Sequence, residues 1–526
     1  MKVLVAEKIA ASGIEMLKGE FEVDVKTDLT PEQLVAEIGV YDALIVRSAT
    51  KATREVIEAG VNLKIIGRAG VGVDNVDVQA ATERGIIVCN APTSNIVSAA
   101  EQTIALMLAQ ARSIPQANAS MKEGKWERSK FTGTEVYEKT LAVFGLGRIG
   151  SLVVERARGL GMKIVGFDPY ITPDRAAAMG VELYGSVDDL LPLADFITVH
   201  LPKTKETIGM FGAEQFAKMK DGVRLINTAR GGIYQMEALA DALRSGKVAS
   251  AGIDVFEVEP CTDSPLIEFP NVVLTPHLGA STEEAQDRAG EQIADFVAAG
   301  LRGEMVPTAV NIAPVAPDVY EKVGPYIQLA ENLGKLMAQT ARGGIESLNI
   351  SFIGGLAEVD TRILKTAVLK GLLTVASAES INFVNADYYA EQRGIQVSET
   401  KRAETHDYVS LITVKSATPT GPVAAGATLV GKRDEPRLVS LYQHDIDMTP
   451  SQFMAFFIYD DRPGMIGKVG TLLGAHEINI ASMQVGRTTV GGEALMGINI
   501  DTPVPAELLE QIVGEAGIND AWSVEL

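Results

Sequence analysis

A glycine-rich segment between two short apolar runs constrains the fold of this chain more than any other feature. Residues 140–170 read TLAVFGLGRIGSLVVERARGLGMKIVGFDPY. An apolar run at 141–144 precedes three glycines, apolar residues then recur at helical spacing over 149–160, and a second apolar run at 164–167 ends in Asp168. This order of strand, glycine turn, helix, strand and acid predicts a dinucleotide-binding βαβ unit.

The glycines of this unit have distinct physical roles. Gly145 permits the tight turn, Gly147 lets the backbone approach a pyrophosphate, and Gly150 lets the helix pack closely on the strand. The helix begins near Arg148 and Ile149, where free N–H groups and the positive end of the helix dipole would face the phosphates.

The acid at the end of the unit predicts the type of dinucleotide. Asp168 would accept hydrogen bonds from the hydroxyls of the adenine ribose. An acid at this position repels the additional phosphate of NADP, so we expect NAD as the cofactor. A glycine turn alone is a weak signal, but here the flanking strands, helix and acid that the motif requires are all present.

The overall composition limits the classes of function. With 526 residues the chain has room for about three or four domains. The net charge is −21, with 68 acidic against 47 basic residues, which argues against a nucleic-acid partner. Only two cysteines are present, which excludes a disulfide framework and suits a reducing cytosol. The sequence has no signal-peptide pattern, no long apolar segment and no zinc-like ligand spacing, so we expect a cytoplasmic protein without membrane contact or bound metal.

Two long helical patterns divide the N-terminal part of the chain. Residues 2–90 alternate short apolar runs with helical patterns, which predicts a parallel α/β sheet. One helix is expected over 94–113, capped by Ser94, and another over 281–300, where Ser281 begins a capping box. If both helices cross between domains, the first domain is discontinuous and the cofactor domain is inserted into it.

The C-terminal part differs in composition. Prolines interrupt the segment 303–325, and we place a domain boundary near residue 315. Residues 320–448 mix helical and strand-like stretches, whereas residues 453–526 follow the order strand, helix, strand, strand, helix, strand of a ferredoxin-like module. A small module of this kind more often regulates or assembles than catalyses.

The predicted fold class is therefore α/β with four domains. Two doubly wound parallel-sheet (Rossmann-like) domains precede an α+β intervening domain and a C-terminal ferredoxin-like domain. The expected boundaries are 1–95 plus 282–314 for the substrate-binding domain, 96–281 for the NAD-binding domain, 315–449 for the intervening domain and 450–526 for the C-terminal domain.

Polar clusters follow two strands of the first predicted sheet. The cluster at 47–50 (RSAT) and the cluster at 67–74 (GRAGVGVD) both lie where open parallel sheets bind ligands. Three glycines in the second cluster could expose backbone N–H groups to an anion, with Arg68 beside them. The alternative is a pair of surface turns with solvated arginines. Because both clusters follow corresponding strand ends, a binding site is expected as much as a pair of surface turns.

Three residues that could act on a substrate follow strands of the cofactor domain. Arg230 lies in NTARGG, Glu259 in EVEP and His277 in TPHLG. Arg230 can bind a carboxylate bidentately and polarise the carbonyl that receives hydride. His277 can take the hydroxyl proton as hydride leaves, and Glu259 can accept the other ring N–H and fix the tautomer. Together these side chains suit the oxidation of a 2-hydroxy acid.

Each of these residues also has a purely structural interpretation. A lone histidine is usually a surface residue or a satisfied core residue, and Glu-Pro is a frequent turn pair. His200 also ends a strand of the cofactor domain and is expected to line the cofactor side. Cys261 has no sequence neighbour that would activate it, and we assign it no role.

The motifs GLGRIG, FDPY, NTARGG, GIDVFEVEP and TPHLGAST, in this order and spacing, resemble those of the D-isomer-specific 2-hydroxy acid dehydrogenases. The resemblance covers residues 1–312. Within that family, VRSAT and GRAGVGVDNVD are similar to the D-3-phosphoglycerate dehydrogenase branch. The block at 320–448 resembles the intervening domain of its long form, and the segment FFIYDDRPGMIGKVGTLLGAHEINIASMQVGR resembles an ACT domain, an amino-acid-binding module.

The resemblance implies oxidation of 3-phosphoglycerate by NAD to 3-phosphohydroxypyruvate, the first committed step of serine synthesis, in a homo-oligomer that is commonly a tetramer. It also implies the roles given above for the three catalytic residues. The expected NAD contacts are Gly145, Gly147, Arg148, Ile149, Gly150, Asp168, Thr228, Ala229, Asp254, Gly279 and Ala280, with Asp254 near the nicotinamide carboxamide. The expected contacts of the substrate phosphate and carboxylate are Arg47, Ser48, Arg68, Val71 and Gly72, with Lys130 as a weaker candidate.

The ACT-like segment implies an effector site. Short forms of the family place His and Asn just before the RPG turn, whereas this chain has Tyr459, Asp460 and Asp461 there. With Asn479, Tyr459 and Asp461 are similar to the effector site of the long form. The resemblance therefore implies feedback by L-serine bound between paired ACT domains.

Two other functions fit parts of the sequence. A glyoxylate or hydroxypyruvate reductase would carry the same three catalytic residue types but would not need residues 320–526. A non-catalytic NAD-sensing or co-repressor protein could use the same fold. The retention of all three residue types and the lack of a basic or disordered tail argue against that second alternative.

Overall fold

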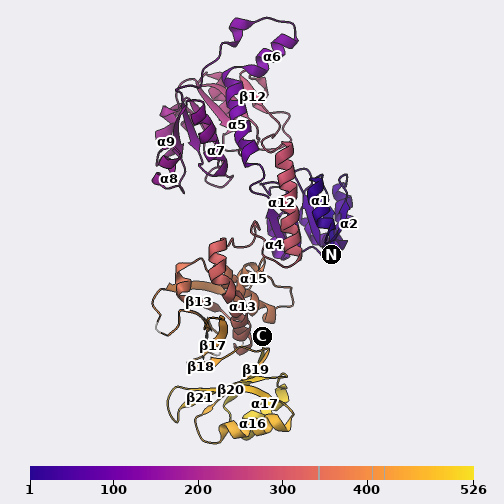
Figure 1. Ribbon diagram of the computed structural model, residues 1–526, viewed down its shortest axis with the longest axis vertical. Coiled ribbons are helices and arrows are strands. Elements are labelled where there is room, and N and C mark those ends of the chain that lie inside the picture. Colours follow the sequence, from indigo (N-terminus) through magenta and orange to yellow (C-terminus); the bar gives the residue numbers. More distant parts are fainter. Residues whose placement is uncertain (342–343, 406, 420) are drawn as a thin grey trace.

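The computed structural model describes residues 1–341, 344–405, 407–419 and 421–526. Four β-sheets follow one another along the chain. Figure 1 shows them distributed along the long axis of an elongated molecule, with the seven-stranded sheet at one end and the C-terminal four-stranded sheet at the other.

Five parallel strands form the first sheet, in the order β2-β1-β3-β4-β5. Its central strands are runs of buried aliphatic residues, as expected for a sheet that helices cover on both faces. The strands are Lys2–Val5 (β1), Glu22–Val25 (β2), Ala43–Val46 (β3), Ile65–Arg68 (β4) and Ile87–Asn90 (β5). The helices around it are Ala11–Lys18 (α1), Pro31–Glu37 (α2), Arg54–Ala59 (α3), Val78–Glu83 (α4) and Glu283–Leu301 (α12).

Seven parallel strands form the second sheet, in the order β12-β11-β10-β9-β6-β7-β8. The strands are Thr140–Phe144 (β6), Lys163–Phe167 (β7), Glu182–Leu183 (β8), Phe196–Val199 (β9), Val223–Asn227 (β10), Val248–Ile253 (β11) and Val272–Leu274 (β12). The helices are Ile96–Ala111 (α5), Ile114–Lys122 (α6), Arg148–Gly159 (α7), Pro173–Ala178 (α8), Val187–Leu190 (α9), Ala213–Lys218 (α10) and Met236–Arg244 (α11). The strand order reverses between β6 and β9, which is where sheets of this type bind dinucleotides.

Core residues show which sheet each long crossing helix covers. Leu106 and Met107 of α5 lie in one core cluster with residues of β6 and α7. Ile293 and Val297 of α12 lie in the core of the first sheet. The chain thus leaves the first sheet before α5 and returns to it with α12, as Figure 1 shows.

The expected caps of these two helices are wrong. The hydroxyl of Ser94 donates to the carbonyl of Ala91 at 2.9 Å and caps nothing, because α5 begins two residues later. The cap of α12 is Thr282, whose hydroxyl accepts from the backbone N–H of Ala285, so Ser281 begins no capping box. In both cases a neighbouring residue has the backbone conformation that precedes the helix.

The third and fourth sheets form the C-terminal half. The third has the order β14-β13-β15-β16-β17-β18, and the fourth is the antiparallel sheet β20-β21-β19-β22. The strands are Ser347–Gly354 (β13), Gln396–Arg402 (β14), Ser410–Ala417 (β15), Val423–Val430 (β16), Glu435–Leu441 (β17), His444–Met448 (β18), Phe453–Asp460 (β19), Ile480–Arg487 (β20), Glu493–Ile500 (β21) and Asp520–Glu525 (β22). The helices are Pro317–Thr340 (α13), Arg362–Ala376 (α14), Ala386–Gln392 (α15), Met465–Ala475 (α16) and Ala506–Ala516 (α17). The predicted fold class is confirmed.

The third and fourth sheets share one hydrophobic core. Helices α16 and α17 cover one face of the fourth sheet, whereas Met454, Phe456 and Trp522 on the other face pack in one cluster with residues of α13. The Trp522 ring stacks on Phe456 with ring centroids 5.4 Å apart, and its Nε1 donates to the hydroxyl of Thr340 at 3.2 Å. The last two sheets are therefore packed as one unit.

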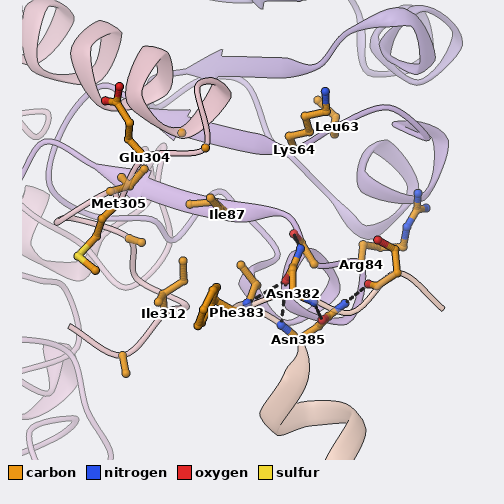
Figure 2. A pocket seen from close by; sticks show the side chains of 18 of the residues that line it. Leu63, Lys64, Arg84, Ile87, Glu304, Met305, Ile312, Asn382, Phe383 and Asn385 are labelled. Atoms are coloured by element: carbon orange, nitrogen blue, oxygen red, sulfur yellow. Dashed lines mark hydrogen bonds between the residues drawn. The ribbon is translucent and has the colours of Figure 1, made fainter. Parts of the chain in front are cut away.

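The first sheet meets this unit across a cleft of about 860 Å³. Figure 2 shows Asn382 and Asn385 in the lining of this cleft. The side chain of Asn382 donates to the carbonyl of Gly85 at 2.7 Å. Gly85 has a φ of +70°, and a Cβ there would lie 2.6 Å from the Asn382 amide nitrogen, so the contact requires glycine.

Candidate active site

The glycine turn after β6 has the geometry of a nucleotide-binding loop. Gly145 has a φ of +93°, and a Cβ there would lie 2.5 Å from the carbonyl oxygen of His200. A Cβ on Gly150 would lie 2.0 Å from the carbonyl oxygen of Gly145, so the helix could not pack as it does with any larger residue. Gly147 faces open space and precedes α7 without a side-chain cap, which leaves the first N–H groups of the helix available to a phosphate.

Asp168 holds this turn in place. One of its oxygens accepts from the backbone N–H of Leu146 at 2.8 Å, and the other accepts from that of Tyr170 at 2.9 Å. Each oxygen retains acceptor capacity for a ribose hydroxyl. The residues present at this end of the second sheet therefore fit a dinucleotide.

His277 and Glu259 are in direct contact at the carboxyl ends of β12 and β11. Nδ1 of His277 lies 2.7 Å from Oε2 of Glu259, and Oε1 of Glu259 accepts from the backbone N–H of Phe256 at 2.9 Å. An ionised carboxylate can only accept, so Nδ1 carries the proton and Nε2 has the free lone pair. The backbone of His277 has a φ of +54°, an uncommon conformation for a residue other than glycine.

Asp254 fixes the turn that carries His277. Its side chain is fully buried and accepts from the Thr275 hydroxyl at 2.5 Å and from the N–H groups of Leu278 at 2.7 Å and Gly279 at 2.8 Å. Its carbonyl accepts from the N–H of His277 at 2.8 Å. Asp254 thus determines the position of the histidine, and its expected contact with the cofactor stays a prediction.

The turn after β10 places Arg230. The buried side chain of Asn227 accepts from the N–H of Ala229 and donates to the carbonyl of Arg230, both at 2.9 Å. The Thr228 hydroxyl pairs with that of Thr103 at 2.7 Å. The sequence analysis assigned no role to Asn227, because a polar residue at the end of a strand is common and no residue spacing marks this one.

Arg230 lies beside a cationic cluster of the first sheet. Its Nε is 3.9 Å from the carboxylate of Asp74, and a Cβ on Gly72 would lie 2.7 Å from its guanidinium. Burial, together with the charges of Arg230 and Arg47, lowers the pKa of Arg68 to about 10, although Asp74 and Glu7 oppose this shift. Three guanidinium groups held this close together favour the binding of an anion.

A cleft of about 290 Å³ brings the two groups of predicted residues together. From the first sheet it is lined by Arg47, Ser48 and Arg68, and from the second by Glu259 and His277. It is smaller than the cleft in Figure 2, but the latter has none of these side chains around it. Arg230, Val71 and Gly72 lie outside its lining, next to Arg68 and Asp74.

The predicted effector residues lie at opposite ends of the fourth sheet. Tyr459 and Asp461 are at the C-terminal end of β19, whereas Asn479 precedes β20, whose first residue Ile480 pairs with Ile500 at the other end. Tyr459 is buried, and burial raises the pKa of its hydroxyl. Asp461 accepts from Arg487 and from the N–H of Gly491, both at 3.2 Å. Asn479 donates to Asp501 at 2.8 Å and is exposed.

The remaining candidates are separate from the cleft. Lys130 pairs with Glu127 at 3.5 Å and lies in the short 3-10 helix Arg128–Phe131 that follows α6. His200 is bonded to the Thr198 hydroxyl, and burial lowers its pKa to about 4. Within the described residues, no group of three or more His, Cys, Asp or Glu is placed to hold a metal, and no helix is both long and apolar enough to cross a membrane.

Comparison with known families assigns the segments that contain the second, third and fourth sheets. Residues 104–279 match the NAD-binding domain of the D-isomer-specific 2-hydroxyacid dehydrogenases. Residues 322–442 match the intervening domain of D-3-phosphoglycerate dehydrogenase, and residues 454–517 match the ACT domain. The C-terminal half thus carries both domains that the sequence motifs predicted.

Similarity to individual proteins extends over the whole chain. The D-3-phosphoglycerate dehydrogenase of Synechocystis is 48% identical over 526 residues, which cover 100% of this chain and 95% of that protein. The enzyme of Archaeoglobus fulgidus is 45% identical, with 100% of both chains covered. The chain belongs to the D-3-phosphoglycerate dehydrogenase family. Within this family it has an NAD-binding domain and an ACT regulatory domain, so the predicted family, cofactor and regulatory module are confirmed.

Solved structures show how much of this architecture is shared with other dehydrogenases. A glyoxylate reductase from Paecilomyes thermophila is 32% identical with a TM-score of 0.54, covering 59% of this chain and 98% of its own. D-lactate dehydrogenase from Escherichia coli is 28% identical with a TM-score of 0.53, covering 59% of this chain and 100% of its own. The glyoxylate reductase alternative therefore accounts for only part of the chain, whereas the D-3-phosphoglycerate dehydrogenase family accounts for all of it.

Proposed function

We propose that the chain oxidises 3-phosphoglycerate to 3-phosphohydroxypyruvate with NAD, and that His277, Glu259 and Arg230 carry out the reaction. The observation that carries this proposal is the contact of His277 with Glu259, in a cleft that Arg47, Ser48 and Arg68 line from the opposite side. A proton acceptor and an anion-binding cluster around one cleft suit an anionic 2-hydroxy acid.

The proton leaves the substrate through His277. Nε2 takes the proton of the 2-hydroxyl group, while the Nδ1–H bond to Glu259 holds the ring and stabilises the imidazolium that forms. In the reverse direction the imidazolium returns the proton to the carbonyl oxygen. NAD, bound along the turn at Gly147, supplies the hydride acceptor.

The substrate anions are held by the arginines. Arg230 binds the carboxylate next to the reacting carbon, and Arg47, Ser48 and Arg68, with the amides of Val71 and Gly72, share the remaining contacts. The cofactor contacts proposed above include Thr228, Ala229 and Ala280, which follow the same strand ends as Arg230 and His277.

L-serine is proposed as the effector of the ACT domain, bound by Tyr459, Asp461 and Asn479 between paired domains. Asn479 is exposed and Asp461 is partly exposed, but they lie at opposite ends of the sheet, so one site can combine them only where two paired domains meet. We also propose the domain boundaries given by the sequence, since each range contains one sheet.

A homo-oligomer, proposed as a tetramer, is supported by apolar exposure on the segment that leaves the second sheet with α6. Trp126 is 80% exposed, and Ile114, Met121 and Tyr137 are exposed as well. Figure 1 shows α6 at the far end of the second sheet, where a second copy could cover this segment. A cytoplasmic location is proposed from the two free cysteines.

An assay of NADH formation tests the function. We expect turnover with 3-phosphoglycerate, little with glycerate or 2-hydroxyglutarate, and inhibition by millimolar L-serine. Turnover of glycerate at the rate of 3-phosphoglycerate would contradict the proposed substrate, and unchanged activity and thermal stability in L-serine would contradict the proposed effector.

A further inference from the structure

The turn that carries Arg47 and Ser48 is held by two side chains that the proposed mechanism does not use. Both come from other segments of the first sheet: Glu7 follows β1, and Asn75 follows the glycine cluster after β4. Because β1 and β3 are parallel neighbours, with Val5 opposite Ile45, their carboxyl ends place Glu7 directly beside Arg47.

Glu7 binds the amide side of the turn. Its Oε1 accepts from the N–H groups of Arg47 and Thr50, both at 2.8 Å, and its Oε2 accepts from the N–H of Ala49 at 3.3 Å. A carboxylate that accepts three N–H groups of one turn fixes the direction in which the side chains of that turn project.

Asn75 binds the carbonyl side of the same turn. Its side-chain amide donates to the carbonyl of Arg47 at 2.8 Å and to that of Thr50 at 2.6 Å. The guanidinium of Arg47 is tied to the same region, because it donates to the carbonyl of Lys8 at 3.1 Å. The turn is thus closed from both sides before any substrate arrives.

We propose that Glu7 is a positioning residue for substrate binding: its carboxylate orders the turn 47–50 so that Arg47 and Ser48 face the cleft. Since Glu7 occupies the amides of Arg47, Ala49 and Thr50, those amides are not available to a substrate anion. Recognition by this turn then depends on its side chains, and a substrate phosphate or carboxylate meets a preformed arginine rather than a flexible loop.

The charge of Glu7 adds a second effect. Its carboxylate acts favourably on the cationic form of Arg68, which the charges of Arg47 and Arg230 disfavour. Together with Asp74, which acts in the same direction and more strongly, Glu7 offsets part of the repulsion within the cationic cluster. This inference rests on the proposed binding role of Arg47.

Steady-state kinetics of the full-length enzyme test the inference with Glu7→Gln. We expect KM for 3-phosphoglycerate to rise by about tenfold to a hundredfold. The substitution replaces one carboxylate oxygen, which accepts from backbone N–H groups of the turn, by an NH₂ group that cannot accept from them. We expect kcat and KM for NAD to change by less than threefold. Glu7→Asp, which keeps the charge but has a shorter reach, should recover part of the affinity. The control is Glu15→Gln on α1, an exposed carboxylate whose ion pair is with Lys18.

Two further variants, Arg47→Ala and the double variant that combines it with Glu7→Gln, separate the inference from the proposed function. If Arg47→Ala leaves KM for 3-phosphoglycerate unchanged, the proposed substrate site is wrong. If Arg47→Ala raises KM but Glu7→Gln leaves it within twofold of the unmodified enzyme, only the positioning role is wrong. If Glu7 acts through the turn, the double variant raises KM by much less than the product of the two single effects, whereas the effects of independent roles would multiply.

Should Glu7→Gln fail to fold, Asn75→Ala tests the same turn from its other side. We expect the same split, with KM for 3-phosphoglycerate raised and kcat little changed. An unchanged KM in that variant overturns the inference.

Discussion

The imidazole of His277 and the carboxylate of Glu259 meet at 2.7 Å although they follow different strands, β12 and β11. Both partners are fixed independently of each other: the carboxylate by the N–H of Phe256, and the histidine backbone by Asp254. The fold alone therefore sets the orientation of the His277 ring and places its Nδ1 against a carboxylate.

Removal of the base should affect turnover more than binding. We expect His277→Ala to lower kcat by about 10²–10⁴-fold, the usual loss for a general acid–base group, with a small change in KM for NAD. Initial rates of NADH formation measure this. His476→Ala, a change at an exposed histidine of the ACT domain, is the control; near-normal turnover of His277→Ala would exclude His277 from the mechanism.

The carboxylate can be changed without removing the base. Glu259→Gln keeps an acceptor for Nδ1–H but loses the charge that stabilises the imidazolium, so we expect kcat to fall by about tenfold to a hundredfold. The pH profile of kcat should shift as well. A profile identical to that of the unmodified enzyme would show that Glu259 does not act through His277.

One variant can separate the observed support of the turn by Asp168 from its proposed contact with the cofactor. Asp168→Ala should raise KM for NAD and reduce the preference for NAD over NADP, because the repulsion of the additional phosphate is lost. Comparison of kcat/KM for both cofactors measures this, with Asp174→Ala on the exposed start of α8 as the control. An unchanged ratio would mean that Asp168 only supports the turn at Leu146.

His200 should make the protein sensitive to mild acid. Its pKa is lowered from 6.5 to about 4 by burial, so the folded state binds fewer protons than the unfolded state between these values. This contribution to stability is complete above pH 6.5 and is lost as the pH falls towards 4, amounting to about 2 kcal/mol by pH 4.5. Urea unfolding at pH 7 and pH 4.5 should show a smaller loss for His200→Gln than for the unmodified protein. Equal losses would contradict a neutral, buried ring.

Trp522 should be the side chain that most strongly stabilises the joint C-terminal unit. We expect Trp522→Ala to lower the free energy of unfolding of this unit by about 3–5 kcal/mol, because it opens a cavity between the two sheets. Trp522→Phe retains the stacking on Phe456 but loses the bond to Thr340, which should cost about 1 kcal/mol. Denaturant titration of both variants, with Tyr170→Ala at a 95% exposed position as the control, measures the difference. Equal effects of the two variants would contradict the role of packing.

The sequence predicted the strands with continuous apolar runs and missed those without them. The apolar runs at 141–144 and 164–167 lie within the observed strands Thr140–Phe144 and Lys163–Phe167. The edge strand β2 was missed because Glu22–Val25 alternates with charged residues and is only partly buried. A run of apolar residues in the sequence indicates a buried strand, and an edge strand such as β2 is buried only in part.

The same limit applies to the site. Arg230, Glu259 and His277 could be identified because their residue types suggest chemistry at strand ends. Glu7 and Asn75 bind backbone groups of a turn that is distant in sequence, whereas Asn227 binds those of the turn that directly follows it. An isolated polar residue after a strand indicates neither role. The helix caps were misplaced for a related reason, since the choice between adjacent Ser, Asn and Thr residues depends on backbone angles.

The core common to the intervening and ACT sheets limits how this regulatory module can be reused. An ACT segment excised at Thr449 would carry Met454, Phe456 and Trp522 into water, and the remainder would expose the matching surface of α13. A chimaera that grafts this ACT domain onto another dehydrogenase must therefore transplant residues 317–526 as a single unit.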